Sequence, residues 1–182
     1  MSKKSILTIA TFAMAVLAAT SFAQQPPAAN PADVVPDKMP FDVPYGAPIT
    51  LDRAEAAITA AIAESQKRGW KMNVAVVDSG GNLVAFRRMD GAQLASIQIA
   101  EHKARAAARF RRETKVFEVG INVNNLNALI TLDDVIGSRG GIPLVEAGKI
   151  IGAIGCSGGT ALRTRWSAES LSAPSSSTAQ RD

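Results

Sequence analysis

The stretch GGIPLVEAGKIIGAIGCSGGT, residues 140–160, carries the strongest fold signal in the sequence. It predicts two short apolar strands joined by a tight turn at Glu146-Ala147-Gly148. Its glycines stand where the backbone bends or approaches another segment closely. The spacing of Gly152, Gly155 and Gly158 matches no dinucleotide-binding fingerprint, and no lysine follows them as in a P-loop. We therefore expect a structural hairpin and not a phosphate site.

Upstream of this hairpin, the sequence predicts a helix followed by a second strand pair. Thr50 is placed to cap the helix, and Gly69 ends it. The strands are expected at 73–77 and 83–88, joined by a turn over 78–82. Apolar and small residues recur at helical spacing in the first helix: Leu51, Ala54, Ile58, Ala61, Ile62 and Ser65.

A long alanine-rich helix is expected from Ala92 to about Arg112, and residues 116–132 are expected to be less regular. The packing stripe of this second helix consists of Ile97, Ala100, Ala104, Ala107 and Ala108. A further helix is expected after Thr160. The order of elements predicts a small single-domain α+β fold, in which helices cover an antiparallel sheet of paired hairpins, of profilin or PAS-like shape.

The N-terminal residues have the features of an export signal. Lys3 and Lys4 precede an apolar run, and Ser21-Phe22-Ala23 predicts cleavage after Ala23. The run is short for a membrane anchor, so we expect no stable membrane span and a periplasmic or secreted protein. The predicted organisation is a signal peptide at 1–23, a proline-rich arm at 24–48, a folded domain at 49–171 and a disordered, low-complexity tail at 172–182.

Composition and isolated polar residues exclude several classes of function. Aromatic residues make up 5% of the chain and are not interleaved with basic ones, so nucleic-acid binding is not expected. The single cysteine, Cys156, cannot form an intramolecular disulfide and is expected in the core. Asp78 begins a Gly-rich turn, where a turn role explains it as well as a site role. Asp133 and Asp134 are adjacent and make a poor acid–base pair or metal site.

Several segments, in their order and spacing, resemble the GlcG/HbpS-like haem-binding family. The resemblance covers about Met39 to Thr160 and is carried by residues 39–50, 74–83, 89–92, 95–97, 102–105 and the hairpin. It implies a compact domain, assembly into a homo-oligomer and a small-molecule ligand. Some family members bind haem or take part in haem degradation, which predicts an exported haem-binding protein. The alternatives are an enzyme or sensor for an organic acid or a corrinoid, and a non-catalytic assembly protein.

A candidate haem site lies on the second helix. His102 is the only histidine, and Arg105 and Arg109 follow it at helical spacing on the same face. An imidazole can ligate iron, and guanidinium groups can bind propionates. We therefore expect His102 near the metal and the two arginines near the propionates, with Lys103 reaching the pocket or an acidic neighbour. A solvated helix face is the alternative, and some haem-binding family members use a threonine hydroxyl as ligand.

The family pattern stops after Thr160. Family members usually continue with glycine, small residues and an acidic pair, whereas this chain continues with ALRTRWSA at residues 161–168. Loss of one base from a codon series for Gly-Ala-Ala-Asp-Glu-Val-Val-Ser would produce Ala-Leu-Arg-Thr-Arg-Trp-Ser, as at residues 161–167. We hypothesise a frameshift near codon 161, so the last helix of the domain has no support from the resemblance.

Overall fold

The structure is a computed structural model that describes residues 42–158. In chain order its elements are α1 (Leu51–Lys67), β1 (Asn73–Asp78), β2 (Leu83–Arg88), α2 (Ser96–Arg109), α3 (Lys115–Asn122), the 3₁₀ helix η2 (Asn127–Thr131), β3 (Gly141–Glu146) and β4 (Lys149–Ser157). The signal peptide, most of the proline-rich arm, the last expected helix and the tail lie outside the described residues.

The four strands form one antiparallel sheet in the order β2-β1-β4-β3. Each predicted hairpin is present, and the two hairpins join through β1 and β4 at the centre of the sheet. The turn of the second hairpin contains Ala147 and Gly148, which both have positive φ, 47° and 72°. Two such residues match the mirror-image turn that suits the twist of paired strands. The predicted α+β fold of paired hairpins is confirmed.

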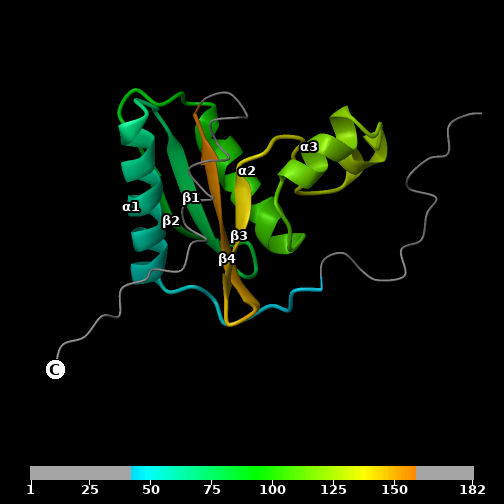
Figure 1. Cartoon of the computed structure of the whole chain (residues 1–182), viewed down its shortest axis with the longest axis horizontal. Coiled ribbons are helices and arrows are strands. Elements are labelled where there is room, and N and C mark those ends of the chain that lie inside the picture. Colours follow the sequence, from blue (N-terminus) through cyan, green and yellow to red (C-terminus); the bar gives the residue numbers. More distant parts are fainter. Residues whose placement is uncertain (1–41, 159–182) are drawn as a thin grey trace, which may run out of the picture. The chain divides into compact units, whose positions relative to one another are not determined.

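Helices cover both faces of the sheet (Figure 1). On one face, α1 packs Ala54, Ile58 and Ala61 against Val74 and Val76 of β1. On the other face, the alanines of α2 pack against β1 and β4. Most of both predicted stripes is buried, but Leu51 is 56% exposed, while Ile62 and Ile97 are only half-buried.

The face beneath α2 tapers across the sheet. Phe86, Ala75, Gly155 and Gly141 are paired across successive strands from β2 to β3. The side chains therefore become smaller from β2 to β1, and the residues of β4 and β3 beneath α2 are glycines, which have no side chain. A Cβ atom at Gly155 would lie 2.0 Å from the carbonyl oxygen of Ala100, and one at Gly141 would lie 2.2 Å from that of Lys103. The helix backbone thus rests directly on the two strands.

The segment before α1 extends the sheet beyond the end of β1. Ile150 donates a backbone hydrogen bond to Pro44 and accepts one from Gly46, at 2.8 and 2.7 Å. The backbone N–H of Ile49 donates to Ile151 at 2.8 Å. Part of the predicted arm therefore lies across the domain.

The structure corrects three local predictions. Thr50 occupies the N-cap position of α1, but its side chain makes no capping hydrogen bond. The second helix is shorter than expected, because residues 92–95 form turns and Arg111, with φ of 55°, follows its C-terminus. Residues 116–132, expected to be irregular, contain most of α3 and all of η2. Within residues 42–158, no helix is both long and apolar enough to cross a membrane.

We predict that Gly155→Ala lowers the free energy of unfolding by at least about 2 kcal/mol, because the new methyl group must displace helix backbone. Gly137→Ala is the control, since a Cβ there meets only the tip of Ile121, at 3.0 Å. Urea denaturation of both variants measures the difference. Equal stability of the two variants would contradict the close contact between α2 and β4.

Candidate functional site

The outer face of α2 carries three of the four predicted site residues. His102 is half-buried there, and Arg105 and Arg109 follow on the same face. Both arginines form ion pairs with Asp134: Nη1 of Arg105 lies 3.7 Å from Oδ1, and Nη1 of Arg109 contacts Oδ2. The structure therefore keeps the predicted His–Arg–Arg face together and adds a carboxylate that partly neutralises it.

Arg109 also braces the turn between β1 and β2. Its Nε donates to the carbonyl oxygen of Gly80 at 3.2 Å. A Cβ at Gly81, where φ is +87°, would lie 2.7 Å from the same Nε atom and 3.2 Å from Cγ of Arg105. The Tyr45 hydroxyl donates to the backbone oxygen of Arg109 at 2.7 Å. These contacts hold the arginine stems in place and restrict how far they can move toward a ligand.

Asp78 is a turn residue. Its Oδ1 accepts hydrogen bonds from the backbone N–H groups of Gly80 and Asn82, at 2.8 and 2.9 Å. Burial opposes ionisation of this carboxyl, but the hydrogen bonds from Asn82 and Gly80 outweigh it and hold its pKa below the ordinary value. The turn explanation of Asp78 is supported by these contacts.

Lys103 lies on a different side of α2 from His102. It is 2% exposed, and its Nζ donates to the carbonyl oxygen of Cys156 at 3.4 Å. Burial lowers the pKa of Lys103 to about 8, although the nearby Cys156 and Glu118 raise it. Lys103 thus sits beneath α2, away from the face that carries the two arginines.

An ion pair lies near this buried lysine. Arg139 donates to Glu118 through its Nε, at 2.6 Å, and through its backbone N–H, at 2.8 Å. Burial alone would raise the pKa of Glu118. The hydrogen bonds from Arg139 lower it by more, so the pKa lies below its ordinary value. Glu118 is therefore the acidic neighbour expected for Lys103, although its hydrogen bonds go to Arg139.

Cys156 is a core residue, as expected. It is fully buried, and burial raises the pKa of its thiol to about 12. A thiol that remains protonated at neutral pH is a poor nucleophile and a poor metal ligand. Within residues 42–158, no group of three or more His, Cys, Asp or Glu side chains could hold a metal ion.

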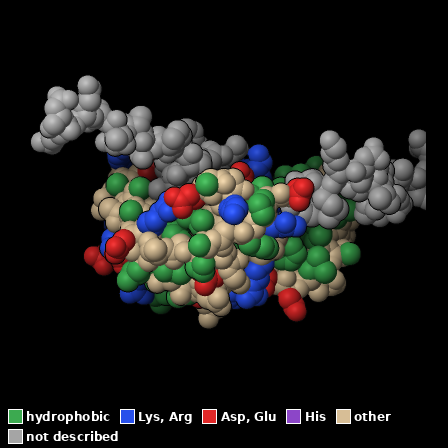
Figure 2. Space-filling view, turned by 90° about the horizontal axis from the view of Figure 1, so that it is seen from below, with side chains coloured by type: hydrophobic (Ala, Val, Ile, Leu, Met, Phe, Trp, Pro, Cys, Tyr) green, Lys and Arg blue, Asp and Glu red, His purple; other side chains and the backbone are tan. Residues whose placement is uncertain are grey.

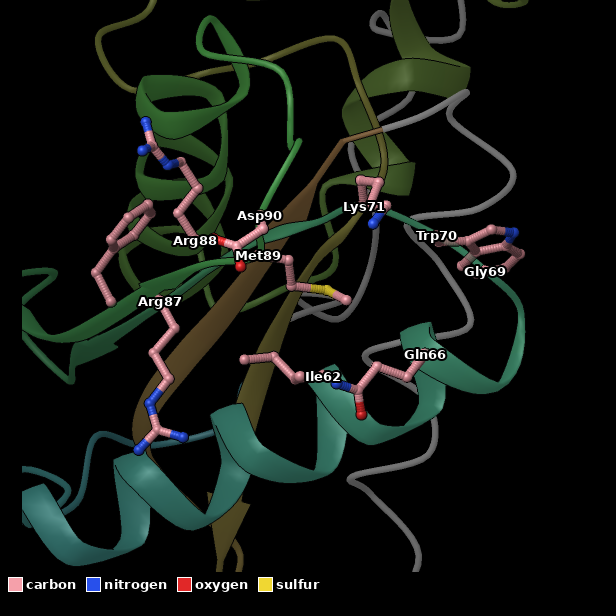
Figure 3. A pocket seen from close by; sticks show the side chains of 10 residues that line it. Ile62, Gln66, Gly69, Trp70, Lys71, Arg87, Arg88, Met89 and Asp90 are labelled. Carbon is pink, nitrogen blue, oxygen red and sulfur yellow. The ribbon is translucent and has the colours of Figure 1, made fainter.

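Three hollows on the surface of the described domain are lined by residues other than the predicted site residues. The largest, about 680 Å³, lies between α1 and the end of β2 and is called the α1–β2 hollow here (Figure 3). Its lining consists of Ile62, Gln66, Gly69, Trp70, Lys71, Phe86, Arg87, Arg88, Met89 and Asp90. The second, about 310 Å³, lies beside β3, and the third, about 500 Å³, lies on α3. None of these three contains His102, Lys103, Arg105 or Arg109.

The polar groups on α2 fit haem chemistry in part. His102 offers an imidazole for iron, and Arg105 and Arg109 offer guanidinium groups for carboxylates. A haem also needs apolar walls, and the three hollows do not provide them next to His102. The face can therefore supply a ligand and cations, while an apolar wall must come from elsewhere.

Two features of this region escaped the sequence analysis. The adjacency of Asp133 and Asp134 predicts a poor acid–base pair or metal site and gives no sign that the Asp134 carboxylate pairs with Arg109 and Arg105, which lie 25 and 29 positions earlier. Of the two positions expected for Lys103, in the pocket or beside an acidic neighbour, the structure shows the second, and the side chain is buried near Glu118. Neither feature has a local signal. The Asp134 contacts depend on how the segment after α3 packs against α2, and the burial of Lys103 depends on how α2 packs against β3 and β4.

We predict that Lys103→Met raises the free energy of unfolding at pH 7, by about 1–3 kcal/mol, because it removes a buried charge. Between about pH 8 and 10.5 the unfolded chain binds a proton at Lys103 that the folded chain lacks. Stability of the wild type therefore rises with pH through this window, and the variant loses that part of the rise.

Chemical denaturation between pH 6.5 and 10.5 measures both effects. Lys149→Gln, which changes an exposed lysine of β4, serves as the control. A Lys103→Met variant that is less stable than the wild type at pH 7 and keeps its full pH dependence would refute the assignment of a buried charge.

Comparisons with known proteins identify a family and relatives of this chain. A family model described as "Haem degrading protein HbpS-like" matches residues 49–170. Protein GlcG of Escherichia coli K12 is 41% identical over 109 residues, which cover 60% of this chain and 81% of GlcG. An uncharacterised 15.0 kDa protein of the Citrobacter freundii dhaT-dhaS intergenic region is 34% identical over 127 residues, covering 68% of this chain and 89% of that protein.

Solved structures share the fold. The Klebsiella pneumoniae protein ORFY superposes with a TM-score of 0.65 at 26% identity, covering 75% of this chain and 92% of that one. A double mutant of Streptomyces reticuli HbpS superposes with a TM-score of 0.63 at 26% identity, covering 81% and 94%. The paired hairpins and the family match agree, and the chain belongs to the HbpS-like family of haem-degrading proteins.

Proposed function

We propose that the protein is an exported haem-binding protein of the GlcG/HbpS type, active in haem storage or degradation. The observation that carries the proposal is the family match over residues 49–170, whose description names haem degradation. The arrangement of His102, Arg105 and Arg109 on one helix face supports it, because these groups suit iron and propionates. Residues 1–23 would direct export to the periplasm or the medium.

In this proposal the chain's own residues would bind and orient the group. His102 would ligate iron, and Arg105 and Arg109 would exchange part of their contact with Asp134 for the propionates. Lys103 supports the site only indirectly, because it lies beneath α2. Bound haem would supply the redox and oxygen chemistry of its iron.

A homo-oligomer would supply the missing apolar wall. Large hydrophobic side chains are exposed on α3 and the segment after it: Val116, Val123, Ile130 and Leu132, at 49%, 68%, 66% and 48%. Figure 2 shows hydrophobic side chains gathered at the end of the molecule where α3 lies in Figure 1. Exposed apolar groups of this extent often mark contact surfaces, which supports assembly of several copies.

We predict that purified protein gives a Soret shift on addition of haem and that His102→Ala abolishes the shift or lowers the affinity at least tenfold. Gln98→Ala is the matched control, since Gln98 is an exposed residue one turn before His102. Visible spectroscopy during haem titration measures both variants. A wild type without any Soret shift would contradict haem binding, whereas an unchanged titration in His102→Ala would reject only this ligand.

Export makes a separate prediction. The mature protein should begin at Gln24 and be recovered from the periplasm or the medium, because the signal is removed on secretion. Mass spectrometry of the intact protein from cell fractions measures the N-terminus. Recovery of the uncleaved chain from the cytoplasm would overturn the export part of the proposal.

A further inference from the structure

The helices of residues 42–158 cover only part of the sheet face on which α1 lies. α1 packs against β1 and β2, whereas α2 packs on the other face, against β1, β4 and β3. Figure 1 accordingly shows α1 beside β2 and β1, with β4 and β3 farther from it. We call the remaining part of this face the β3–β4 apolar face, and its side chains are those of Ile142, Leu144, Ile154 and Cys156.

Most of these side chains are buried although α1 lies away from them. Ile154 and Cys156 have no exposed area, and Ile142 is 8% exposed. Ile142 belongs to the edge strand β3, which lies two strand spacings, or about 10 Å, from β1. The inner side of α1 carries the short side chains of Ala54 and Ala61, which do not extend over this distance. The burial of Ile142 therefore requires cover other than α1.

The segment before α1 reaches only one end of the β3–β4 apolar face. Cγ2 of Ile49 lies 3.1 Å from where a Cβ of Gly152 would be, and Gly152 pairs with Leu144 near the turn of the hairpin. Ile142 and Ile154 are paired farther along the strands, away from this turn. The middle of the face thus gains no cover from this segment.

The chain leaves the described domain at the opposite end of the same face. β4 ends at Ser157, and a Cβ at Gly158 would lie 2.8 Å from Cα of Met72, another member of the apolar cluster beneath α1. The family match continues past this point to residue 170. As a helix, residues 159–171 would span about 20 Å, similar to the distance of about 17 Å along β4 from Ser157 back to Gly152.

α1 leaves room for such a segment beside it. Glu55 and Thr59 of α1 both contact Arg87 of β2, so these residues mark the side of the helix that faces β2. Ala57 lies on the other side by helical geometry and packs against the apolar cluster. A small side chain at this position allows close approach of a neighbouring segment.

We propose that residues 159–171 dock on the β3–β4 apolar face, beside α1, and complete the core on this side of the sheet. Leu162 and Trp166 are four positions apart, so one side of a helical turn would carry both. They would contact Ile142 and Ile154 in the middle of the face. The unusual sequence after Thr160 would then still close the domain, and this docking does not depend on haem binding.

Cys156 reports whether the face is covered, because it is the only cysteine and belongs to this face. A chromogenic disulfide reagent should modify it slowly in the full-length protein, since a buried thiol is unreactive. Truncation after Gly158 should accelerate the reaction at least tenfold, whereas truncation after Leu171 should leave the rate unchanged. Circular dichroism melting checks that each variant is folded. Equal rates in the two truncated proteins would overturn the proposal.

A second measurement keeps the full chain and does not depend on truncation. Trp70 and Trp166 are the two tryptophans, so Trp70→Phe leaves Trp166 as the only indole. Its emission should lie at shorter wavelength in the native protein than in urea, and acrylamide should quench it at least threefold less. Adding Ile142→Ser should increase the quenching, whereas Val145→Ser, at an exposed residue of the same strand, should not.

Two further results would refute the assignment. Native emission at the same wavelength as in urea would show that Trp166 contacts no apolar face, and equal quenching in the Ile142→Ser and Val145→Ser variants would place it elsewhere. A Cys156 reaction that accelerates on dilution of the full-length protein would assign the cover to a second copy of the chain. A rate independent of protein concentration supports docking of the chain's own residues.

Discussion

The backbone of α2 packs directly on the sheet, and the positions of the other elements follow from this contact. Gly141 and Gly155 are directly paired across β3 and β4, and both lie under the backbone of α2. Since neither has a side chain, the carbonyl oxygens of Ala100 and Lys103 come within the space that a Cβ would need. The small residues of α2 complete this contact, so helix and sheet meet through backbone and methyl groups.

This contact fixes what each side of α2 can do. The residues on its inner side have no path to solvent, which is why Lys103 is buried and reaches only the carbonyl oxygen of Cys156. The same burial makes the Cys156 thiol unreactive. The outer side carries the groups that remain available for chemistry, and His102, Arg105 and Arg109 lie there together.

The outer face is itself organised by a distant segment. Asp134 joins Arg105 and Arg109, while Arg109 also holds the turn between β1 and β2 through Gly80. A ligand carboxylate would have to compete with Asp134 for these guanidinium groups.

Local sequence patterns account for the parts of the protein whose structure depends on near neighbours in the chain. Alternation, turn residues and helical spacing were sufficient for both hairpins, for α1, for the centre of α2 and for the His102–Arg105–Arg109 face. Short-range rules failed at Thr50, at the end of α2 and over α3, where packing outweighs propensity. Local patterns give no sign that Lys103 is buried, that Asp134 binds two arginines or that Ile62 and Met89 line one hollow. Each of these contacts joins segments that are remote along the chain, and its geometry is set by how closely helices can approach the sheet.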